Sequence, residues 1–459
     1  MTVAEPAHDL KTPRRIAVVG GGVSGLVAAR LLADDHDVHV FEAAHYVGGH
    51  ANTIDVEMDG QVYSVDTGFM VFNDRTYPNF IQLLRQLDID AQASDMSFSV
   101  HCERTGVEYQ GSSLNGLFAQ RRNLLRPSFY RMLADIVRFN REGRALAERG
   151  DTELSLGEFL DRGRSGRAFR QQYLVPMISA IWSASAADVE QFPALFLFRF
   201  CDNHGLLQLR NRPVWRTIPG GSRRYVAALS APFAEQIRLR TPVTSVRRGI
   251  DADGEGGEAA AGARRQVAVE SSDGVEMFDA VVMATHADQT LRILADADEW
   301  ERQILGAFPY QSNEAVLHSD VSLMPRSRRA WASWNYRVGA DVGRAASVTY
   351  DLSRLQRVSS PRPILVTLNP TRSIDESLVH RRFNYDHPLF TLAAVEAQAR
   401  FDEINGPRAT YFCGAYRFNG FHEDGVASAL EVGAHFGKGL ERCQAVSTRA
   451  SSDTVALAR

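Results

Sequence analysis

The stretch IAVVGGGVSG at residues 16–25 decides the fold. Its apolar start is typical of a short, buried parallel strand. Gly20, Gly22 and Gly25 then fall in the spacing G-x-G-x-x-G, and LVAARLLA continues as a predicted helix. In this motif the first glycine allows a tight turn, the second lets the backbone approach a pyrophosphate, and the third permits close helix packing. The stretch therefore predicts a strand–turn–helix unit that binds a dinucleotide at the start of its helix.

An acidic residue follows at the distance expected for ribose binding. HDVHVFE, residues 36–42, predicts the next strand and ends in Glu42, about twenty residues after the glycine turn. A carboxylate at this place accepts hydrogen bonds from ribose hydroxyls, whereas a basic residue accommodates the 2′-phosphate of NADP. The sequence therefore favours NAD or FAD over NADP.

The composition bounds the class of protein. A length of 459 residues predicts two or three units, and 44% hydrophobic with 23% charged residues is ordinary for a globular chain. The formal net charge of −4 argues against a nucleic-acid binder. The four cysteines are scattered, so we expect reduced thiols and no metal site. The chain shows neither a signal peptide nor a membrane-spanning run, so we expect a cytoplasmic protein.

A second glycine turn distinguishes FAD from NAD. AAHYVGGHANT, residues 43–53, carries Gly48 and Gly49 a few residues after the ribose acid. Here the chain resembles the flavin-containing amine oxidase superfamily, whose members have a Gly-Gly-Arg turn against the cofactor phosphates. His50 stands in place of the arginine, so the resemblance implies that backbone amides make these phosphate contacts.

The stretch VYSVDTGFMVF, residues 62–72, strengthens the resemblance. The superfamily has a strand ending in Asp-x-Gly that brings backbone close to the flavin ring, and Asp66, Thr67 and Gly68 match it. The alternative is an ordinary transition from strand to turn.

The C-terminal part carries a third matching stretch, ATYFCGAYRFNGFHEDGVASALEVGAHFGKGL, at residues 409–440. Related flavoproteins end on a helix whose N-terminus points at the flavin, where its dipole stabilises negative charge. The usual acid after the first glycine is Ala415 here. Glu423 and Asp424 either take over polar contacts or cap the helix. His422 is either a hydrogen-bonding group or a weak candidate for the catalytic residue.

The middle of the chain carries patterns without a specific motif. Residues 113–150 predict helices with Arg121, Arg122, Arg126 and Arg131 near their start, which is either a solvated face or a surface for an anionic membrane. FPALFLFRF, residues 192–200, is either core or the wall of a lipophilic cavity. The Gly/Ala-rich segment 251–265 predicts a hairpin tip.

Alternating segments between residues 291 and 400 predict antiparallel strands of a substrate-binding sheet. Its aromatic residues are either core or, for one or two of them, the wall of a pocket at the flavin. Tyr310 and Trp334 are the weak candidates for substrate binding.

These patterns predict an α/β fold. A discontinuous Rossmann-like FAD-binding domain of the two-dinucleotide-fold type would be formed by residues 12–85, 214–290 and 405–445. An intertwined α+β substrate domain, with an antiparallel sheet and a helical insertion, would be formed by residues 86–213 and 291–404. We expect flexible termini at residues 1–11 and 446–459.

The resemblance implies non-covalently bound FAD. The residues expected to contact it are Gly20, Gly22, Val23, Ser24, Gly25, Glu42, Ala43, Gly48, Gly49, His50, Thr67, Gly68, Phe69, Val243, Ala284, Gly414, Glu423, Asp424 and Val426.

Lysine occurs only at positions 11 and 438. Amine oxidases of this superfamily commonly hold a water near flavin N5 with a lysine of the substrate domain, so its absence counts against ordinary amine oxidation. GFHEDG and DTGFMVFN also resemble a bacterial subgroup associated with cyclopropane fatty acid synthases. That resemblance implies an oxidoreductase or isomerase acting on a long-chain fatty acyl group. The alternatives are an amine oxidase, a carotenoid- or porphyrinogen-type desaturase, and a FAD-dependent partner subunit of a lipid-modifying enzyme. For the location of the protein, peripheral contact at the inner membrane face is the alternative to a purely cytoplasmic one.

Overall fold

The computed structural model describes residues 12–150, 154–182, 186–208, 212–250, 266–339 and 347–440. The predicted flexible termini and the predicted hairpin tip at residues 251–265 lie outside these described residues.

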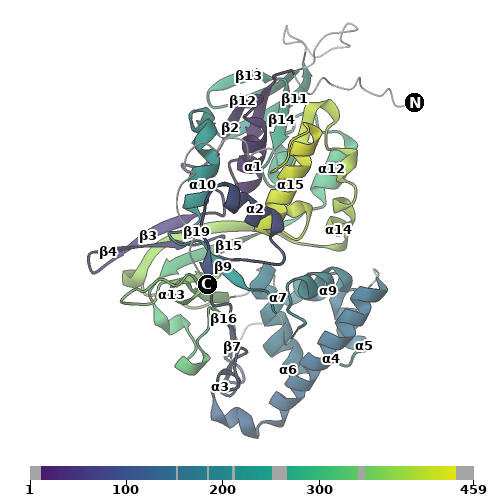
Figure 1. The fold of residues 1–459 in the computed structure, drawn as a ribbon. Coiled ribbons are helices and arrows are strands. Elements are labelled where there is room, and N and C mark those ends of the chain that lie inside the picture. The colour runs from purple at the N-terminus through teal and green to yellow at the C-terminus, as the bar shows by residue number, and fades with distance from the viewer. Residues whose placement is uncertain are drawn as a thin grey trace, which may run out of the picture.

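A five-stranded, wholly parallel sheet forms one end of the molecule (Figure 1). Its order β10-β2-β1-β14-β20 brings together strands that are far apart in the sequence. The strands are β1 (Arg15–Val19), β2 (Asp37–Phe41), β10 (Ile237–Arg238), β14 (Ala280–Met283) and β20 (Thr410–Phe412). The predicted Rossmann-like core is confirmed, because β1 runs directly into α1 (Val23–Leu32) through the glycine turn.

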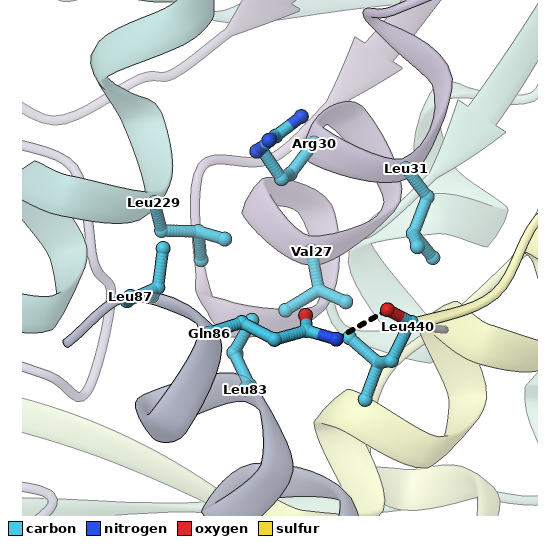
Figure 2. Close-up of a pocket in the computed structure, with 8 residues that line it drawn as sticks. All are labelled: Val27, Arg30, Leu31, Leu83, Gln86, Leu87, Leu229 and Leu440. Atoms are coloured by element: carbon cyan, nitrogen blue, oxygen red, sulfur yellow. Dashed lines mark hydrogen bonds between the residues drawn. The ribbon is translucent and has the colours of Figure 1, made fainter. Parts of the chain in front are cut away.

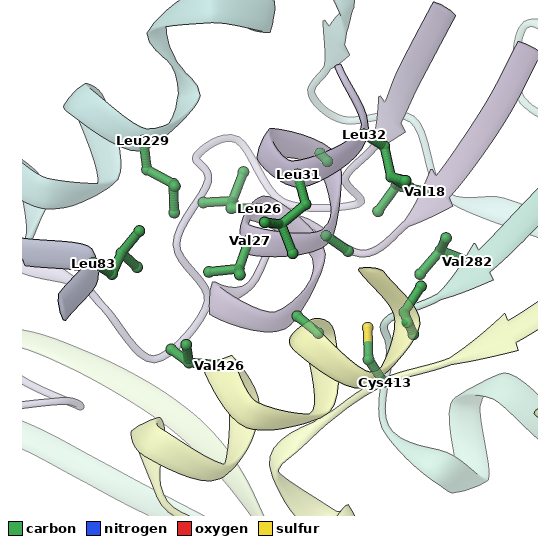
Figure 3. Packing of buried hydrophobic residues seen from close by; sticks show 14 of the residues in the cluster. Val18, Leu26, Val27, Leu31, Leu32, Leu83, Leu229, Val282, Cys413 and Val426 are labelled. Atoms are coloured by element: carbon green, nitrogen blue, oxygen red, sulfur yellow. The ribbon is translucent and has the colours of Figure 1, made fainter. Parts of the chain in front are cut away.

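Two helices from opposite ends of the chain pack together beside this sheet. Figure 3 shows α1 beside α15 (His422–His435), and Val27 of α1 and Val426 of α15 belong to the same buried hydrophobic cluster. Figure 2 shows a hollow of about 30 Å³ between α1, α2 (Pro78–Gln86) and α10 (Arg223–Ser230), closed by a hydrogen bond from the Gln86 amide to the Leu440 carbonyl. A space of this size holds about one water molecule, so it is too small for a dinucleotide or an organic substrate.

Smaller elements surround the parallel sheet. They are the ribbon β3 (Thr53–Met58) and β4 (Gln61–Asp66), the short sheet β5 (Phe72–Asn73), β9 (Trp215–Thr217) and β6 (Gln92–Ala93), the sheet β11 (Val243–Ile250), β12 (Gln266–Ser271) and β13 (Gly274–Phe278), and the helices α11 (Ala287–Ile293), α12 (Glu299–Gly306) and α14 (Leu392–Gln398).

A seven-stranded sheet of order β19-β15-β18-β17-β16-β7-β8 lies across the middle of the molecule (Figure 1). Its strands are β7 (Phe98–Cys102), β8 (Val107–Gln110), β15 (Tyr310–His318), β16 (Trp334–Val338), β17 (Ser347–Asp351), β18 (Leu365–Leu368) and β19 (Val379–Pro388). The prediction of an antiparallel sheet was wrong at one pair, since β16 runs parallel to β7. β7 comes from residues before the helical insertion, whereas the alternating pattern that predicted the sheet begins only at residue 291.

The predicted helical insertion is confirmed. It consists of α3 (Leu114–Leu117), α4 (Pro127–Arg149), α5 (Leu156–Arg162), α6 (Arg167–Phe169), α7 (Val175–Trp182), α8 (Ala186–Gln191) and α9 (Ala194–Asn203). Most of the apolar stretch at 192–200 is core, because Phe192, Phe198 and Phe200 are buried among the other helices. Among the described residues, no helix is long and apolar enough to cross a membrane.

Candidate active site

The three motif glycines serve different purposes at the end of β1. A Cβ atom on Gly25 would lie 1.9 Å from the Gly20 carbonyl oxygen, and one on Gly20 would lie 2.8 Å from the Ala284 carbonyl oxygen. A Cβ on Gly22 would meet no protein atom within 4 Å. The outer two glycines are therefore required by packing, whereas Gly22 keeps the space before α1 open.

The N-termini of α1 and α15 meet at this open space. Gly22 is the N-cap of α1, with no side-chain cap and no acidic residue in the first turn. A Cβ on Gly425 would lie 2.8 Å from Val23 Cγ1 and 2.9 Å from Ser24 Oγ, so α15 begins directly against the start of α1. Two positive helix ends thus lie side by side, an arrangement that suits an anion. The Val426 side chain is buried in the hydrophobic core between these helices.

The Glu42 carboxylate is held in place by backbone amides. One of its oxygens accepts from the Gly21 amide and the other from the Ala44 amide, both at 2.7 Å. Each oxygen keeps a lone pair for a further donor such as a ribose hydroxyl. The Thr241 amide donates to the Glu42 carbonyl oxygen at 2.9 Å, which brings the loop before Val243 alongside. Ala43 is exposed in the same segment.

The second glycine turn packs directly on the first. The Gly48 amide donates to the Gly21 carbonyl oxygen at 2.7 Å, and a Cβ on Gly49 would lie 3.2 Å from the Gly22 Cα. A Cβ on Gly68 would lie 2.3 Å from the His50 carbonyl oxygen, which also accepts from the Phe69 amide at 2.6 Å. The two turns and the Asp-x-Gly segment therefore form one continuous backbone surface.

Asp66 holds this surface together, a role that its motif did not predict. Its carboxylate accepts hydrogen bonds from Thr53 Oγ1 at 2.6 Å and from the Ser222 amide and hydroxyl at 2.9 and 2.7 Å. Burial raises the pKa of this carboxyl group, and these hydrogen bonds oppose the rise. Asp66 thus fixes the start of α10 against the β3–β4 ribbon.

Three histidines and a tyrosine gather where this surface meets the seven-stranded sheet. The His50 ring lies 4.9 Å from Tyr385, 5.4 Å from His387 and 6.4 Å from His286, measured between ring centroids. His50 Nε2 is buried and has no hydrogen-bond partner among the described residues. Burial lowers the pKa of His50 well below its usual range, with His387 adding to the effect, so the ring is neutral at physiological pH. We call these three histidines with Tyr385 the histidine cluster.

Neighbouring hydrogen bonds orient two members of the cluster. Tyr385 Oη lies 2.8 Å from Thr67 Oγ1 and accepts from the Asn52 side-chain amide at 3.0 Å. The Asn313 side-chain amide donates to His387 Nδ1 at 2.9 Å. The ring proton of His387 therefore lies on Nε2, because burial lowers its pKa to about 4 and keeps the ring neutral.

His422 has a different environment from the cluster. Its ring stacks on Phe69 at 3.7 Å, meets Phe80 edge-on at 5.0 Å, and its Nε2 lies 2.7 Å from Tyr225 Oη. Burial lowers the pKa of His422 to about 3. A ring whose Nε2 already has a hydrogen-bond partner suits positioning better than proton transfer.

The two acids at the start of α15 differ in what they bind: Asp424 caps α15 itself, as one predicted alternative had it, whereas Glu423 caps the neighbouring helix α2. The Glu423 carboxylate accepts from the Asn79 and Phe80 amides at 3.0 and 2.9 Å, at the N-terminus of α2. Asp424 accepts from the Phe421 amide at 2.7 Å, and burial raises its pKa to about 7. The Gly414 amide is likewise engaged, because it donates to Ser428 Oγ at 2.9 Å.

One face of the seven-stranded sheet is apolar and only partly covered. Tyr336 and Tyr350 are buried in it, and Trp334 packs edge-on against Tyr350 at 4.9 Å. Half-buried side chains from separate segments meet on this face: Met70, Met96, Phe98, Trp215 and Trp334. We call these five residues the apolar wall, of which the sequence identified only Trp334.

Trp334 and Tyr310 differ in what they offer a ligand. Trp334 Nε1 is buried without a partner among the described residues. Tyr310 stacks on His286 at 4.6 Å and its hydroxyl accepts from the Ala287 amide at 3.1 Å. Tyr310 therefore serves the histidine cluster, while Trp334 keeps a free donor at the apolar wall.

These features fit FAD. The open side of Gly22, the uncapped positive end of α1 and an acid oriented for ribose suit a dinucleotide pyrophosphate with its ribose. The unpartnered His50 Nε2 lies further along the same backbone surface, next to the seven-stranded sheet.

Comparisons with known proteins agree with this geometry. The family model described as flavin containing amine oxidoreductase matches residues 23–319. A probable flavin-containing monooxygenase 1 of Arabidopsis thaliana is 35% identical over 96 residues, which span 19% of this chain and 18% of that protein.

Solved structures share the fold over almost the whole chain. Cyclohexylamine oxidase from Brevibacterium oxydans IH-35A is 15% identical with a TM-score of 0.64, covering 94% of this chain and 99% of the other. A CLA-producing fatty acid isomerase from P. acnes is 16% identical with a TM-score of 0.62, covering 91% and 97%. At these identities the likeness establishes the fold. The family match over more than half of the chain establishes that this FAD-dependent oxidoreductase belongs to the flavin containing amine oxidoreductase family.

Proposed function

We propose that this enzyme oxidises, reduces or isomerises a long-chain apolar substrate, of the fatty acyl class, bound between the histidine cluster and the apolar wall. The observation that carries the proposal is the apolar wall itself, five half-buried apolar side chains gathered on one sheet face. The fold shared with a fatty acid isomerase and the resemblance to the cyclopropane-associated subgroup support the same substrate class.

Backbone and a few side chains would hold the cofactor. The first-turn amides of α1 and the amides of Gly48 and Gly49 would meet the pyrophosphate, and Glu42 would accept the adenosine ribose hydroxyls. The start of α15 would face the flavin, with the positive end of its dipole stabilising negative charge there. The remaining predicted contacts would come from backbone next to these elements: Ala43, Thr67, Gly68, Phe69, Val243, Ala284, Gly414 and Val426.

Bound FAD supplies hydride transfer between a substrate carbon and flavin N5. The chain's own task is to place that carbon and exclude water. The apolar wall would bind the chain of the substrate, and Trp334 Nε1 would donate to a polar group on it. The neutral His50 and His387 rings would hold or release a proton at Nε2, since neither ring carries charge into an apolar site.

Amine oxidation is the second candidate, because cyclohexylamine oxidase shares the fold. Against it stands the absence of lysine from residues 12–437. A desaturase for carotenoids or porphyrinogens, or a partner subunit of a lipid-modifying enzyme, would use the same cofactor contacts.

Anaerobic mixing of the purified holoenzyme with candidate substrates separates these functions. We expect unsaturated phospholipids or fatty acids, but not primary amines or polyamines, to bleach the flavin absorbance. Because an isomerase gives no net bleaching, the products are analysed by mass spectrometry in parallel. Bleaching by amines alone would overturn the proposal, and so would the absence of bleaching and of new acyl products with both the oxidised and the chemically reduced holoenzyme.

A further inference from the structure

A group of exposed apolar side chains lies at the end of the molecule opposite the parallel sheet. Five of the twelve large apolar side chains that are exposed among the described residues fall within residues 114–137. These are Leu114, Leu124, Leu125, Tyr130 and Val137. Leu125 is the most exposed of them at 88%. Exposed apolar side chains that gather in one region, unlike scattered ones, mark an interaction surface. We call residues 114–137 the α3–α4 tip, which lies at the lower end of Figure 1.

The exposed leucines are held on a fixed turn. Leu124 and Leu125 belong to the 3-10 helix η1 (Arg121–Leu125) between α3 and α4. Asn123 is fully buried and its side-chain amide donates to the Glu108 carbonyl oxygen at 3.2 Å, which ties η1 to β8. Tyr130 Oη donates to the Leu124 carbonyl oxygen at 3.1 Å. The fold therefore presents both leucines rather than leaving them on a loose loop.

Positive charge surrounds these side chains. Residues 109–134 contain four arginines, Arg121, Arg122, Arg126 and Arg131, and no acidic residue. Arg121 donates to the Phe118 carbonyl oxygen at 2.7 Å and to Asn115 Oδ1 at 2.6 Å. Arg122 donates to the Gly106 carbonyl oxygen at 2.5 Å. Within the described part of the chain, none of the four arginines forms an ion pair with a carboxylate.

The nearest acids do not neutralise the tip. Glu108 is buried and accepts from the Arg326 and Ser327 amides at 3.1 and 3.0 Å. Asp135 is buried and pairs with Arg138 at 2.8 Å. Three more exposed arginines lie close to the tip, because η5 (Arg328–Ala330) contacts α3 and β8. Arg328 and Arg329 belong to η5, and Arg326 precedes it.

We propose that the α3–α4 tip docks on an anionic lipid surface, with Leu124 and Leu125 inserted among the acyl chains and the arginines at the headgroups. Charge complementarity selects this occupant, because anionic lipids attract basic side chains while the interior of the layer accepts leucine. A soluble acidic protein would satisfy the arginines, but it gives no reason for two leucines at the outermost turn. The proposal does not depend on which substrate the active site takes.

The test is co-sedimentation of the FAD-loaded full chain with vesicles. We expect binding to phosphatidylcholine mixed with phosphatidylglycerol, weaker binding at high salt, and little binding to phosphatidylcholine alone. Leu124→Ser with Leu125→Ser should weaken binding about tenfold or more. Arg121→Gln with Arg122→Gln should weaken it by a similar factor and reduce its salt dependence.

Matched controls come from exposed positions elsewhere on the chain. Leu392→Ser with Val275→Ser, and Arg247→Gln with Arg292→Gln, should bind as the unchanged protein does. Every variant should keep its flavin spectrum, which shows that it is folded. Failure of the unchanged protein to bind would overturn the proposal, as would equal binding by the leucine variant. Binding of a single-stranded RNA that depends on the arginines but not on the leucines, without vesicle binding, would also overturn it.

Discussion

The glycine turn at residues 20–25 and the histidine cluster lie near the same edge of the parallel sheet. The turn presents backbone atoms to a ligand, whereas the cluster presents side chains. The turn offers backbone alone, and two of its three motif glycines pack so closely that no side chain fits. The cluster offers rings from β19, from the end of β14 and from the second glycine turn, with one nitrogen left unpartnered. Backbone suits phosphates, which are the same in every dinucleotide, whereas side chains suit a substrate, which differs from enzyme to enzyme.

The largest expected effect comes from adding a side chain at the turn. Gly25→Val should abolish FAD binding and cost on the order of 4 kcal/mol or more of folding free energy, because its Cβ would overlap the Gly20 carbonyl oxygen. Gly22→Ala is the matched change, since its Cβ meets no protein atom. It should fold normally and only weaken FAD binding. Thermal unfolding and FAD titration of both purified proteins check this pair.

If the two glycine variants unfolded and bound FAD alike, the distinction between a packing glycine and an open one would be wrong. If Gly25→Val kept FAD, the packing argument would be wrong. If Gly22→Ala bound FAD as tightly as the unchanged protein, the open space before α1 would not be where the pyrophosphate lies.

This contrast also explains what the sequence could predict. Gly20, Glu42 and Gly48 could be predicted from the sequence, because the first turn, the acid and the second turn are local patterns with fixed spacing. His286 and His387 were not, because they become neighbours of His50 only after residues more than two hundred positions apart are folded together. The parallel pairing of β7 with β16 was missed for the same reason.

The start of α15, like the glycine turn, is a place where we expect backbone to meet the cofactor. The buried Asp424 at this place should make the free energy of unfolding of the protein depend on pH. The pKa of Asp424 is raised from 3.8 to about 7 in the folded protein. Its contribution to stability is therefore full below about pH 4 and is lost as the pH rises through 7, on the order of 4 kcal/mol. Asp424→Asn, which keeps an acceptor for the Phe421 amide, should remove this dependence. Urea unfolding between pH 4.5 and about 7.5, with FAD in excess, measures it.

A pH dependence of Asp424→Asn that matches the unchanged protein would show that burial of this carboxyl group is incomplete in solution. The control is Asp135→Asn, at a buried carboxylate paired with Arg138 far from α15.

In the histidine cluster, replacing His50 should slow flavin reduction without lowering the free energy of unfolding. His50→Leu removes a buried nitrogen that has no partner, so the free energy of unfolding should stay the same or rise. Flavin reduction by substrate should slow about a hundredfold if the ring moves a proton. Stopped-flow absorbance follows the rate, and its pH profile should lose a limb relative to the unchanged enzyme. Unchanged kinetics with an unchanged profile would remove His50 from the chemistry.

The smallest expected effect tests whether His422, whose Nε2 has a hydrogen-bond partner, differs in role from His50, whose Nε2 has none among the described residues. Tyr225→Phe removes the single hydrogen bond to His422 Nε2 and leaves that nitrogen buried, which should cost about 1–3 kcal/mol of folding free energy. Because Phe69 and Phe80 still hold the ring, flavin reduction should change by less than about threefold, the equivalent of about half a kcal/mol. His422→Gln, which can still bond Tyr225, should likewise change flavin reduction by less than about threefold. A large kinetic loss in Tyr225→Phe at unchanged stability would instead mean that His422 takes part in proton transfer, and the difference between the two histidine sites would disappear.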